Sequence, residues 1–274
     1  MIMGKVIFLD IDGTLVDLQQ RISEETRLAL WRARKNGHKM VLCTDKTYTG
    51  IYPWLMKIPF DGVVASSGAY VRCGEEVVAH HMLDNKKVCE LTKLLWQHGA
   101  ATLAQGVHAR YVNPDHEKKI LDFFARRKMD GNKILNGMTV VENPSAKAAL
   151  ESVLYFVQDR PFTIVLREIL EKFDGYFHVM STGFGCTLED AGMIGKKGVT
   201  KASGMAELLD HWKISRENSI AIGDGPDDFD MIRFAAVGIA MENGIPELKD
   251  NADYMTTSVD HEGVANAFRD FGLV

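Results

Sequence analysis

Hydrophobic residues in the first third of the chain form short continuous runs separated by amphipathic stretches. The run KVIFLDI is apolar on both of its strand faces, which is typical of a parallel strand that is covered on both sides. Ser23 then opens the helical stretch SEETRLALWRARKNG, which Gly37 closes. The runs HKMVLCTD and DGVVASSG predict two further strands, with a short helix near 47–56 between them. This order predicts an α/β fold with a doubly wound, Rossmann-like parallel sheet.

The pattern changes after about residue 82 and predicts an inserted α+β domain. Asp84 opens a helix that runs to His98. The glycines of GFG and of DAGMIGKKG indicate the return to the sheet, so we expect a core at 1–83 and 184–274 with an insert at 84–183. Within the insert we expect strands near 101–106, 108–112, 153–157 and 176–180, and helices near 115–127 and 161–173.

The parallel pattern resumes after the insert. We expect a helix at 199–212, a strand at 219–224 (SIAIGD), a helix at 227–235, a strand at 237–241 (VGIAM) and a helix at 244–250, followed by a terminal strand and helix. The sheet domain is therefore predicted to be split, with the insert lying between its two halves.

Composition and charge narrow the class of protein. The chain has 274 residues, of which 46% are hydrophobic and 25% charged, as in ordinary globular proteins. Its net charge of −5 gives no general electrostatic reason to bind nucleic acid or an anionic membrane. The four cysteines form no C-x-x-C pair, and no apolar run approaches the ~18 residues of a membrane span. We expect a cytoplasmic protein with reduced thiols that is a monomer or a weak homodimer.

Polar residues follow several predicted strands, where open parallel sheets place their ligand sites. The first group is Asp10-Ile11-Asp12-Gly13-Thr14, and the second is Thr44 after VLCT. A lysine in GKKGVTK and the acidic stretch GDGPDD at 223–228 complete the set.

The acidic groups would converge at one edge of the sheet. Their mutual repulsion is unfavourable by several kcal/mol unless a cation offsets it, and hard oxygen ligands suit Mg²⁺. A lone D-x-D-G could equally be a surface turn or the metal site of a glycosyltransferase. The second acidic stretch, at the end of another strand, favours a metal site. The carboxylates concerned are Asp10, Asp12, Asp224, Asp227 and Asp228.

These motifs resemble the haloacid dehalogenase superfamily of phosphatases, in particular its Cof-type branch with a large α/β cap inserted after the third core strand. The matching blocks occur in order over nearly the whole chain. They are DIDGTLVD, VLCT, VVASSGAY, GVTKASGMAELL, SIAIGDGPDDFDMI and VGIAMENGIPELKDNADYMTTSVDHEGVA. The insert resembles the family only in its length and pattern.

The resemblance implies catalytic roles for four residues. Asp10 would be the nucleophile that becomes an aspartyl-phosphate, and Asp12 would protonate the leaving alcohol and then activate water. Thr44 would bind the phosphoryl oxygens. Lys201 would neutralise charge in the transition state; Lys196 and Lys197 compete with it, and Lys197 is the second choice.

The resemblance also implies a magnesium site. Asp10 and Asp224 would be direct ligands, and Asp12 would reach the metal through its backbone carbonyl. Asp228 would hold a water on the metal or orient Lys201.

Three positions depart from the pattern of the family. Asp45-Lys46 replaces the usual Gly-Arg, Asp227 replaces Asn, and Ser67-Gly68 stands where Asn-Gly is usual. Asp45 beside a phosphate would be repulsive unless it pairs with Lys46 or points away. These five residues, with Thr44, are the predicted substrate-binding positions.

The sequence therefore predicts a Mg²⁺-dependent phosphatase that acts on a small phosphorylated metabolite. A sugar phosphate or a phosphorylated cofactor, such as flavin mononucleotide or pyridoxal phosphate, is the expected substrate. Two alternatives stay open, namely a phosphomutase or phosphotransferase on the same scaffold and a non-catalytic sensor of phosphorylated metabolites.

Overall fold

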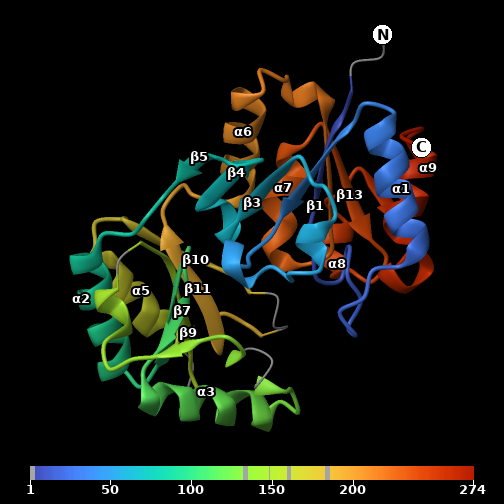
Figure 1. The fold of residues 1–274 in the computed structure, drawn as a ribbon. Helices are drawn as coiled ribbons and strands as arrows, with labels where there is room; N and C mark the ends of the chain where they lie inside the picture. The colour runs from blue at the N-terminus through green and yellow to red at the C-terminus, as the bar shows by residue number, and fades with distance from the viewer. Residues whose placement is uncertain (1–3, 132–134, 148, 159–161, 183–185) are drawn as a thin grey trace. The chain divides into compact units, whose positions relative to one another are not determined.

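The chain folds into two compact units, as seen in a computed structural model that describes residues 4–131, 135–147, 149–158, 162–182 and 186–274. The core unit comprises the chain up to Lys46, Ile51–His80 and Val199–Val274. The inserted unit comprises Thr47–Gly50 and His81–Gly198. Figure 1 shows the ribbon coloured from the N-terminus to the C-terminus. The predicted α/β core with an α+β insert is confirmed.

The core unit is built on one sheet of eight strands in the order β14-β13-β12-β1-β2-β3-β4-β5. β1, β2, β3, β12, β13 and β14 run parallel, whereas β4 and β5 add an antiparallel hairpin. The strands are β1 (Val6–Leu9), β2 (Lys39–Cys43), β3 (Gly62–Ala65), β4 (Tyr70–Cys73), β5 (Glu76–His80), β12 (Ser219–Gly223), β13 (Val237–Met241) and β14 (Tyr254–Thr256).

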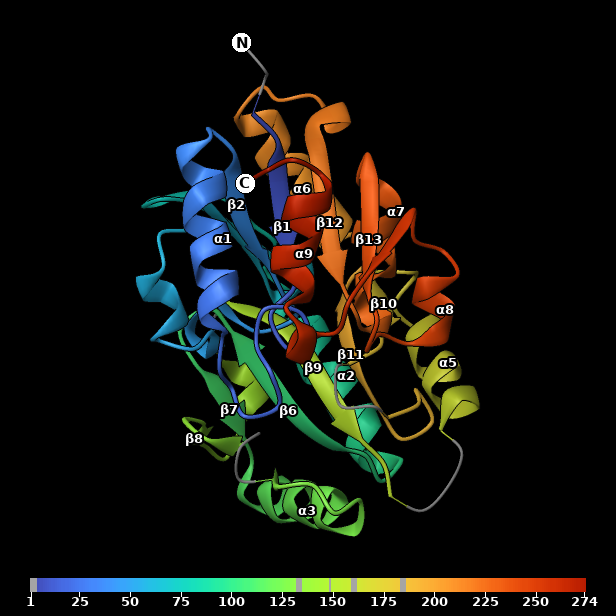
Figure 2. The same ribbon diagram turned by 90° about the vertical axis from the view of Figure 1, so that its right-hand side faces the viewer.

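Helices cover both faces of this sheet, as its continuous apolar strands require. Figure 2 shows α1 (Glu24–Lys35) and α9 (Gly263–Asp270) on one face, with α6 (Lys201–His211) and α7 (Phe229–Phe234) behind the sheet. The short helix α8 (Pro246–Lys249) follows β13. Ser23 caps α1, as predicted, because its side chain accepts the backbone N–H of Thr26. The doubly wound arrangement is thus confirmed.

The inserted unit has a sheet of six strands in the order β10-β11-β9-β6-β7-β8. Asp84 caps its first helix by accepting the Lys87 N–H, so the predicted start of that helix is confirmed. The apolar residues form two clusters, one with α2 and α5 and the other with α3. The elements are α2 (Asn85–Gln97), β6 (Ala101–Gly106), β7 (Arg110–Val112), α3 (Pro114–Arg126), β8 (Thr139–Val140), β9 (Leu150–Phe156), α5 (Thr163–Glu171), β10 (Phe177–Met180) and β11 (Ala191–Lys196).

The predicted end of the insert at residue 183 differs from the structure. Strand β11 pairs with β9 and β10, so the inserted unit continues to Gly198. The glycines of DAGMIGKKG were expected in a hinge, but Gly192 lies within β11, where it leaves room for the Tyr155 hydroxyl. The GFG stretch at 183–185 lies outside the described residues.

Smaller differences concern helix continuity. The short helix expected near 47–56 is two 3₁₀ turns, Tyr48–Gly50 and Leu55–Lys57. The helix expected at 227–235 begins with a 3₁₀ turn at Pro226–Asp228, whose proline restricts the backbone. Among the described residues, no helix is long and apolar enough to cross a membrane.

We expect Phe123→Ala to destabilise the inserted unit. Phe123 is fully buried against Phe124 and Phe156, with ring centroids 5.2 and 5.3 Å away, and its loss would leave a cavity. The free energy of unfolding should fall by about 3–5 kcal/mol, measured by hydrogen exchange of the inserted unit. The exposed Val140→Ala is the control. Equal protection in the two variants would contradict this packing.

Candidate active site

Three neighbouring strands bring the predicted polar groups to one edge of the core sheet. β1 lies between β12 and β2, with Leu9 in register with Ile222 and Leu42. The residues that follow these strand ends therefore emerge side by side, and Asp10 N–H donates to the Ile222 carbonyl at 3.0 Å. Asp10, Thr44 and Asp224 thus meet at the carboxyl edge of the sheet, as the sequence predicts.

Lys201 is the centre of an ion-pair network. Thr200 caps α6, and Lys201 is its first residue, with a fully buried side chain. Burial disfavours its charge, yet the surrounding carboxylates raise the pKa of Lys201 well above its ordinary value. Lys201 is therefore charged. Its Nζ lies 2.9 Å from Asp10 Oδ1, 2.8 Å from Asp227 Oδ2 and 2.6 Å from Asp228 Oδ1.

The second-choice lysine, Lys197, belongs to the inserted unit. Lys197 N–H donates to the Tyr176 carbonyl within the inserted unit, and its Nζ lies beside Gly175. Lys201 is thus the lysine that contacts the predicted nucleophile.

Asp10, Asp224 and Asp228 form a cluster that fits a divalent cation. Each offers a carboxylate oxygen, and these atoms lie within 4.8 Å of one another. Burial and the charge of Asp228 raise the pKa of Asp10 well above its ordinary value, and they raise that of Asp224 to about 7. Burial and mutual repulsion together therefore outweigh the stabilisation that Lys201 gives to these carboxylates. A hard cation such as Mg²⁺ would relieve this repulsion.

Local hydrogen bonds fix the orientation of the cluster. The Thr14 hydroxyl donates to Asp224 Oδ1 at 2.8 Å. Asp228 Oδ2 accepts the backbone N–H groups of Asp224 and Gly225 at 2.9 and 2.8 Å. Gly13 has a φ of +86°, and a Cβ there would lie only 2.2 Å from Asp224 Oδ2. A side chain at residue 13 would therefore fill the cradle beside these oxygens.

The carboxylate of Asp12 is held apart from this cluster. Its Oδ2 lies 2.5 Å from Lys46 Nζ, and its Oδ1 accepts the Tyr52 hydroxyl at 2.6 Å. Its side chain keeps 47% of its accessible surface, unlike the nearly buried Asp10. The sequence motifs missed Tyr52, because no short-range signal links residues 40 positions apart.

Asp45 and Lys46 make different contacts. Lys46 pairs with Asp12, and its backbone N–H donates to Thr44 Oγ1 at 3.2 Å. Burial, followed by the charge of Asp227, raises the pKa of Asp45 to about 6. Lys46, which follows Asp45 in the sequence, thus forms its ion pair with Asp12.

Ser67 and Gly68 pack behind the lysine. Gly68 has a φ of +95°, and a Cβ there would lie 2.0 Å from the Thr200 carbonyl oxygen, directly before Lys201. Ser67 also has a left-handed backbone, with a φ of 50°. Its buried hydroxyl has no hydrogen-bond partner within the described residues. Gly68 therefore acts on the site through the position of α6.

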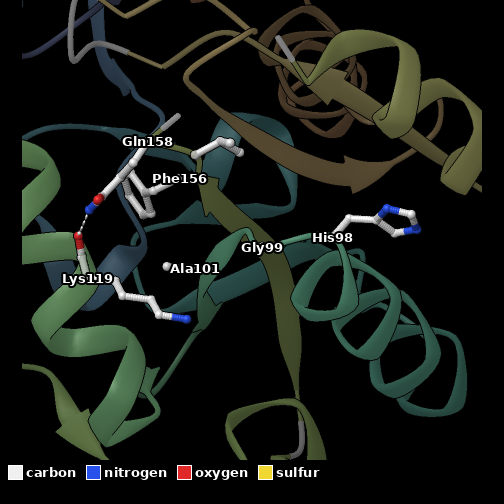
Figure 3. A pocket seen from close by; sticks show the side chains of 7 residues that line it. His98, Gly99, Ala101, Lys119, Phe156 and Gln158 are labelled. Carbon is white, nitrogen blue, oxygen red and sulfur yellow. Dashed lines mark hydrogen bonds between the residues drawn. The ribbon is translucent and has the colours of Figure 1, made fainter. Parts of the chain in front are cut away.

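The inserted unit has its own pocket of about 390 Å³ (Figure 3). The Gln158 side-chain amide donates to the Lys119 carbonyl at 2.8 Å across one side of this pocket. None of the residues that line it carries a carboxylate, so it lacks the chemistry of the core site. They are His98, Gly99, Ala101, Lys119, Phe156, Val157 and Gln158.

The chain belongs to the haloacid dehalogenase-like hydrolase family, whose profile matches residues 7–268. It is similar to a phosphoglycolate phosphatase of Methanothermobacter thermautotrophicus, with 28% identity over 97% of this chain and 98% of the relative. The 5-amino-6-(5-phospho-D-ribitylamino)uracil phosphatase YitU of Bacillus subtilis is 24% identical, with 97% of both chains covered.

A solved structure agrees with this assignment. The HAD subclass IIB sugar phosphatase BT4131 matches with a TM-score of 0.79 and 26% identity, over 99% of this chain and all of that one. The Cof-type resemblance is thereby confirmed, and the protein is a phosphatase of this family.

We expect stability to fall with rising pH when divalent cations are removed. An aspartate whose pKa is raised in the native state binds its proton more tightly there, so stability is lost as pH rises through that pKa. For Asp224, this window extends from about pH 4 to about 7. In EDTA, Tm should fall between pH 5 and 7.5, by about 2–4 °C for each kcal/mol lost.

Asp224→Asn should flatten this pH dependence, and Mg²⁺ should raise the Tm of the unaltered protein at pH 7.5. Asp230→Asn, at an exposed position, is the matched control. An unchanged slope in Asp224→Asn would contradict the assignment of the titration to Asp224.

Proposed function

We propose that the protein is a Mg²⁺-dependent phosphomonoesterase that works through an aspartyl-phosphate on Asp10. The contact between Lys201 Nζ and Asp10 Oδ1, at 2.9 Å, carries this proposal. A buried lysine against a carboxylate at a strand end supplies a positioned nucleophile and a charge that offsets the phosphoryl group. Phosphoryl transfer depends mainly on such positioning and neutralisation.

In the first step, a carboxylate oxygen of Asp10 attacks phosphorus, and the bond from phosphorus to the leaving oxygen breaks. Asp12 gives its proton to that oxygen. In the second step, Asp12 takes a proton from water, which attacks the aspartyl-phosphate and releases phosphate. Lys201 neutralises charge in both steps, and the Thr44 hydroxyl binds a phosphoryl oxygen. Asp10 is regenerated at the end of the cycle.

Asp10, Asp224 and Asp228 would hold the magnesium ion, together with the backbone carbonyl of Asp12. When bound, the ion supplies positive charge to the phosphoryl oxygens and to the attacking carboxylate. Asp228 also holds Lys201, since one of its oxygens contacts the ammonium and the other accepts two backbone N–H groups.

Lys46 and Tyr52 position the acid–base residue. Both donate to the carboxylate of Asp12, one to each oxygen, and so fix its plane beside the sheet edge. Carboxylate oxygens that accept charged and hydroxyl donors are held in one orientation, which general acid–base catalysis requires. The Asp45-Lys46 departure thus has a role, because it supplies one of the two donors.

A small phosphorylated metabolite is the proposed substrate, with a sugar phosphate favoured over a phosphorylated cofactor such as flavin mononucleotide or pyridoxal phosphate. The likeness to a sugar phosphatase at 26% identity supports this choice. The predicted substrate-binding positions include those at which this chain departs from the family pattern, namely Asp45, Lys46, Ser67 and Asp227. Phosphate release from a panel of such esters in the presence of Mg²⁺ tests the choice.

Asp10→Asn should abolish Mg²⁺-dependent hydrolysis of p-nitrophenyl phosphate, because an amide cannot form the acyl phosphate. We expect a loss of at least about 10³-fold in kcat, with an unchanged circular dichroism spectrum. Asp230→Asn should retain full activity. Substantial turnover by a folded Asp10→Asn protein would contradict the assignment of Asp10 as the nucleophile.

Tyr52→Phe should impair the acid step selectively. We expect kcat/KM to fall about tenfold or more for an alkyl phosphate, whose leaving group needs a proton. The fall should be much smaller for p-nitrophenyl phosphate, whose leaving group is stable as an anion.

The matched control is Tyr254→Phe, which removes a similar hydroxyl–carboxylate bond to Asp270. An equal loss on both esters in Tyr52→Phe would mean that Tyr52 supports the fold rather than Asp12.

A further inference from the structure

A second cavity lies in the core unit, between one face of α1, the start of β2 and the segment 57–61. Its volume is about 650 Å³, within the range of small-molecule sites. We call it the basic groove. It is lined by Arg27, Leu30, Trp31, Arg34, Lys35, Gly37, His38, Lys39, Met40, Lys57, Ile58, Pro59, Phe60 and Asp61.

The groove concentrates positive charge on a protein of net charge −5. Five lining residues are arginine or lysine, whereas Asp61 is the one carboxylate among them. Asp61 is already used, since it accepts two hydrogen bonds from Arg34 and one from the Met40 N–H. Within the described residues, Arg27 and Lys57 have no ion-pair partner, so their charges are available to an anion.

The remaining charges of the groove do not offset this excess. His38 Nδ1 accepts the Lys5 N–H at 3.0 Å, and burial lowers its pKa, so His38 is neutral. The Lys39 ammonium lies 4.7 Å from the centre of the Trp212 ring. Among the described residues, Arg34 is thus the one cation of the groove that pairs with a carboxylate.

An aromatic side chain stands among these cations. Trp31 keeps 52% of its surface exposed, and Lys35 Nζ lies 4.0 Å from its ring centre. Arg27, Trp31 and Arg34 share one face of α1 because they are spaced four and three residues apart. The exposed indole can stack on a planar ring, and the cations around it can bind phosphates.

The groove is distinct from the candidate active site. Lys39 begins β2, whereas Thr44 follows the other end of that strand. The five residues of β2 separate the two edges of the sheet by roughly 16 Å. A ligand in the groove therefore does not contact Asp10 or Lys201.

We propose that the basic groove binds a nucleotide that carries two or more phosphates, with its base on Trp31 and its phosphates near Arg27 and Lys57. The volume of the groove and its single exposed indole fit one nucleotide rather than a polymer. The negative charge of the whole chain also opposes a long nucleic acid. This site is independent of the proposed phosphatase mechanism.

Calorimetric titration with ATP tests the proposal, in EDTA and on Asp10→Asn protein so that no hydrolysis intervenes. ATP should bind saturably at one site per chain. The double variant Arg27→Ala/Lys57→Ala should lower the affinity for ATP at least tenfold. Trp31→Ala should lower the affinity for ATP but leave the affinity for inorganic triphosphate unchanged. The matched control Lys118→Ala/Arg167→Ala removes two exposed cations of the inserted unit and should bind normally.

Three results would overturn the proposal: no saturable binding of ATP, binding that the groove substitutions leave intact, or equal affinity of ATP for the protein with and without Trp31. Hydrolysis of p-nitrophenyl phosphate by Arg27→Ala/Lys57→Ala, with Asp10 present, should be unchanged when no nucleotide is added. Failure of the phosphatase proposal would show in that assay and not in the titration.

Discussion

The buried ammonium of Lys201 is the interaction on which the rest of the site depends. Its contacts with Asp10, Asp227 and Asp228 join the end of β1 to the segment after β12. Without this charge, three carboxylates would be packed together in a poorly solvated place, which is unfavourable. The capped start of α6 and the close approach of Gly68 to Thr200 hold the lysine there.

Charge also explains why the two aspartates of D-I-D can differ in function. Asp10 is nearly buried against Lys201, whereas Asp12 is half exposed and contacts Lys46 and Tyr52. Two carboxylates of the same motif thus have different surroundings, which suits one as a nucleophile and the other as an acid–base group. Asp227, where the resemblance to the family leads one to expect asparagine, adds a third carboxylate to Lys201.

Much of the fold followed from local patterns. Continuous apolar runs identified the parallel strands, and Ser23 and Asp84 marked helix starts through side-chain caps that need only a few neighbouring residues. Local patterns predicted the wrong element where a residue type occurs in two kinds of structure, as glycine does in hinges and in strands. Gly192 and Gly195 were assigned to a hinge, but β11 contains them, because strand pairing is decided by distant partners in β9 and β10.

The sequence by itself determined which residues stand at strand ends, and hence the acidic edge, Thr44 and the choice of Lys201. The strand ends follow from chain order and the parallel topology, whereas the choice of Lys201 over Lys196 and Lys197 came from the resemblance to the family. Tertiary structure alone decided that Lys46 pairs with Asp12 rather than Asp45, and that Tyr52 completes this contact. It also decided that the cations of α1 face Lys57 across a groove. Contacts between residues far apart in the chain depend on how the elements pack, which no local pattern encodes.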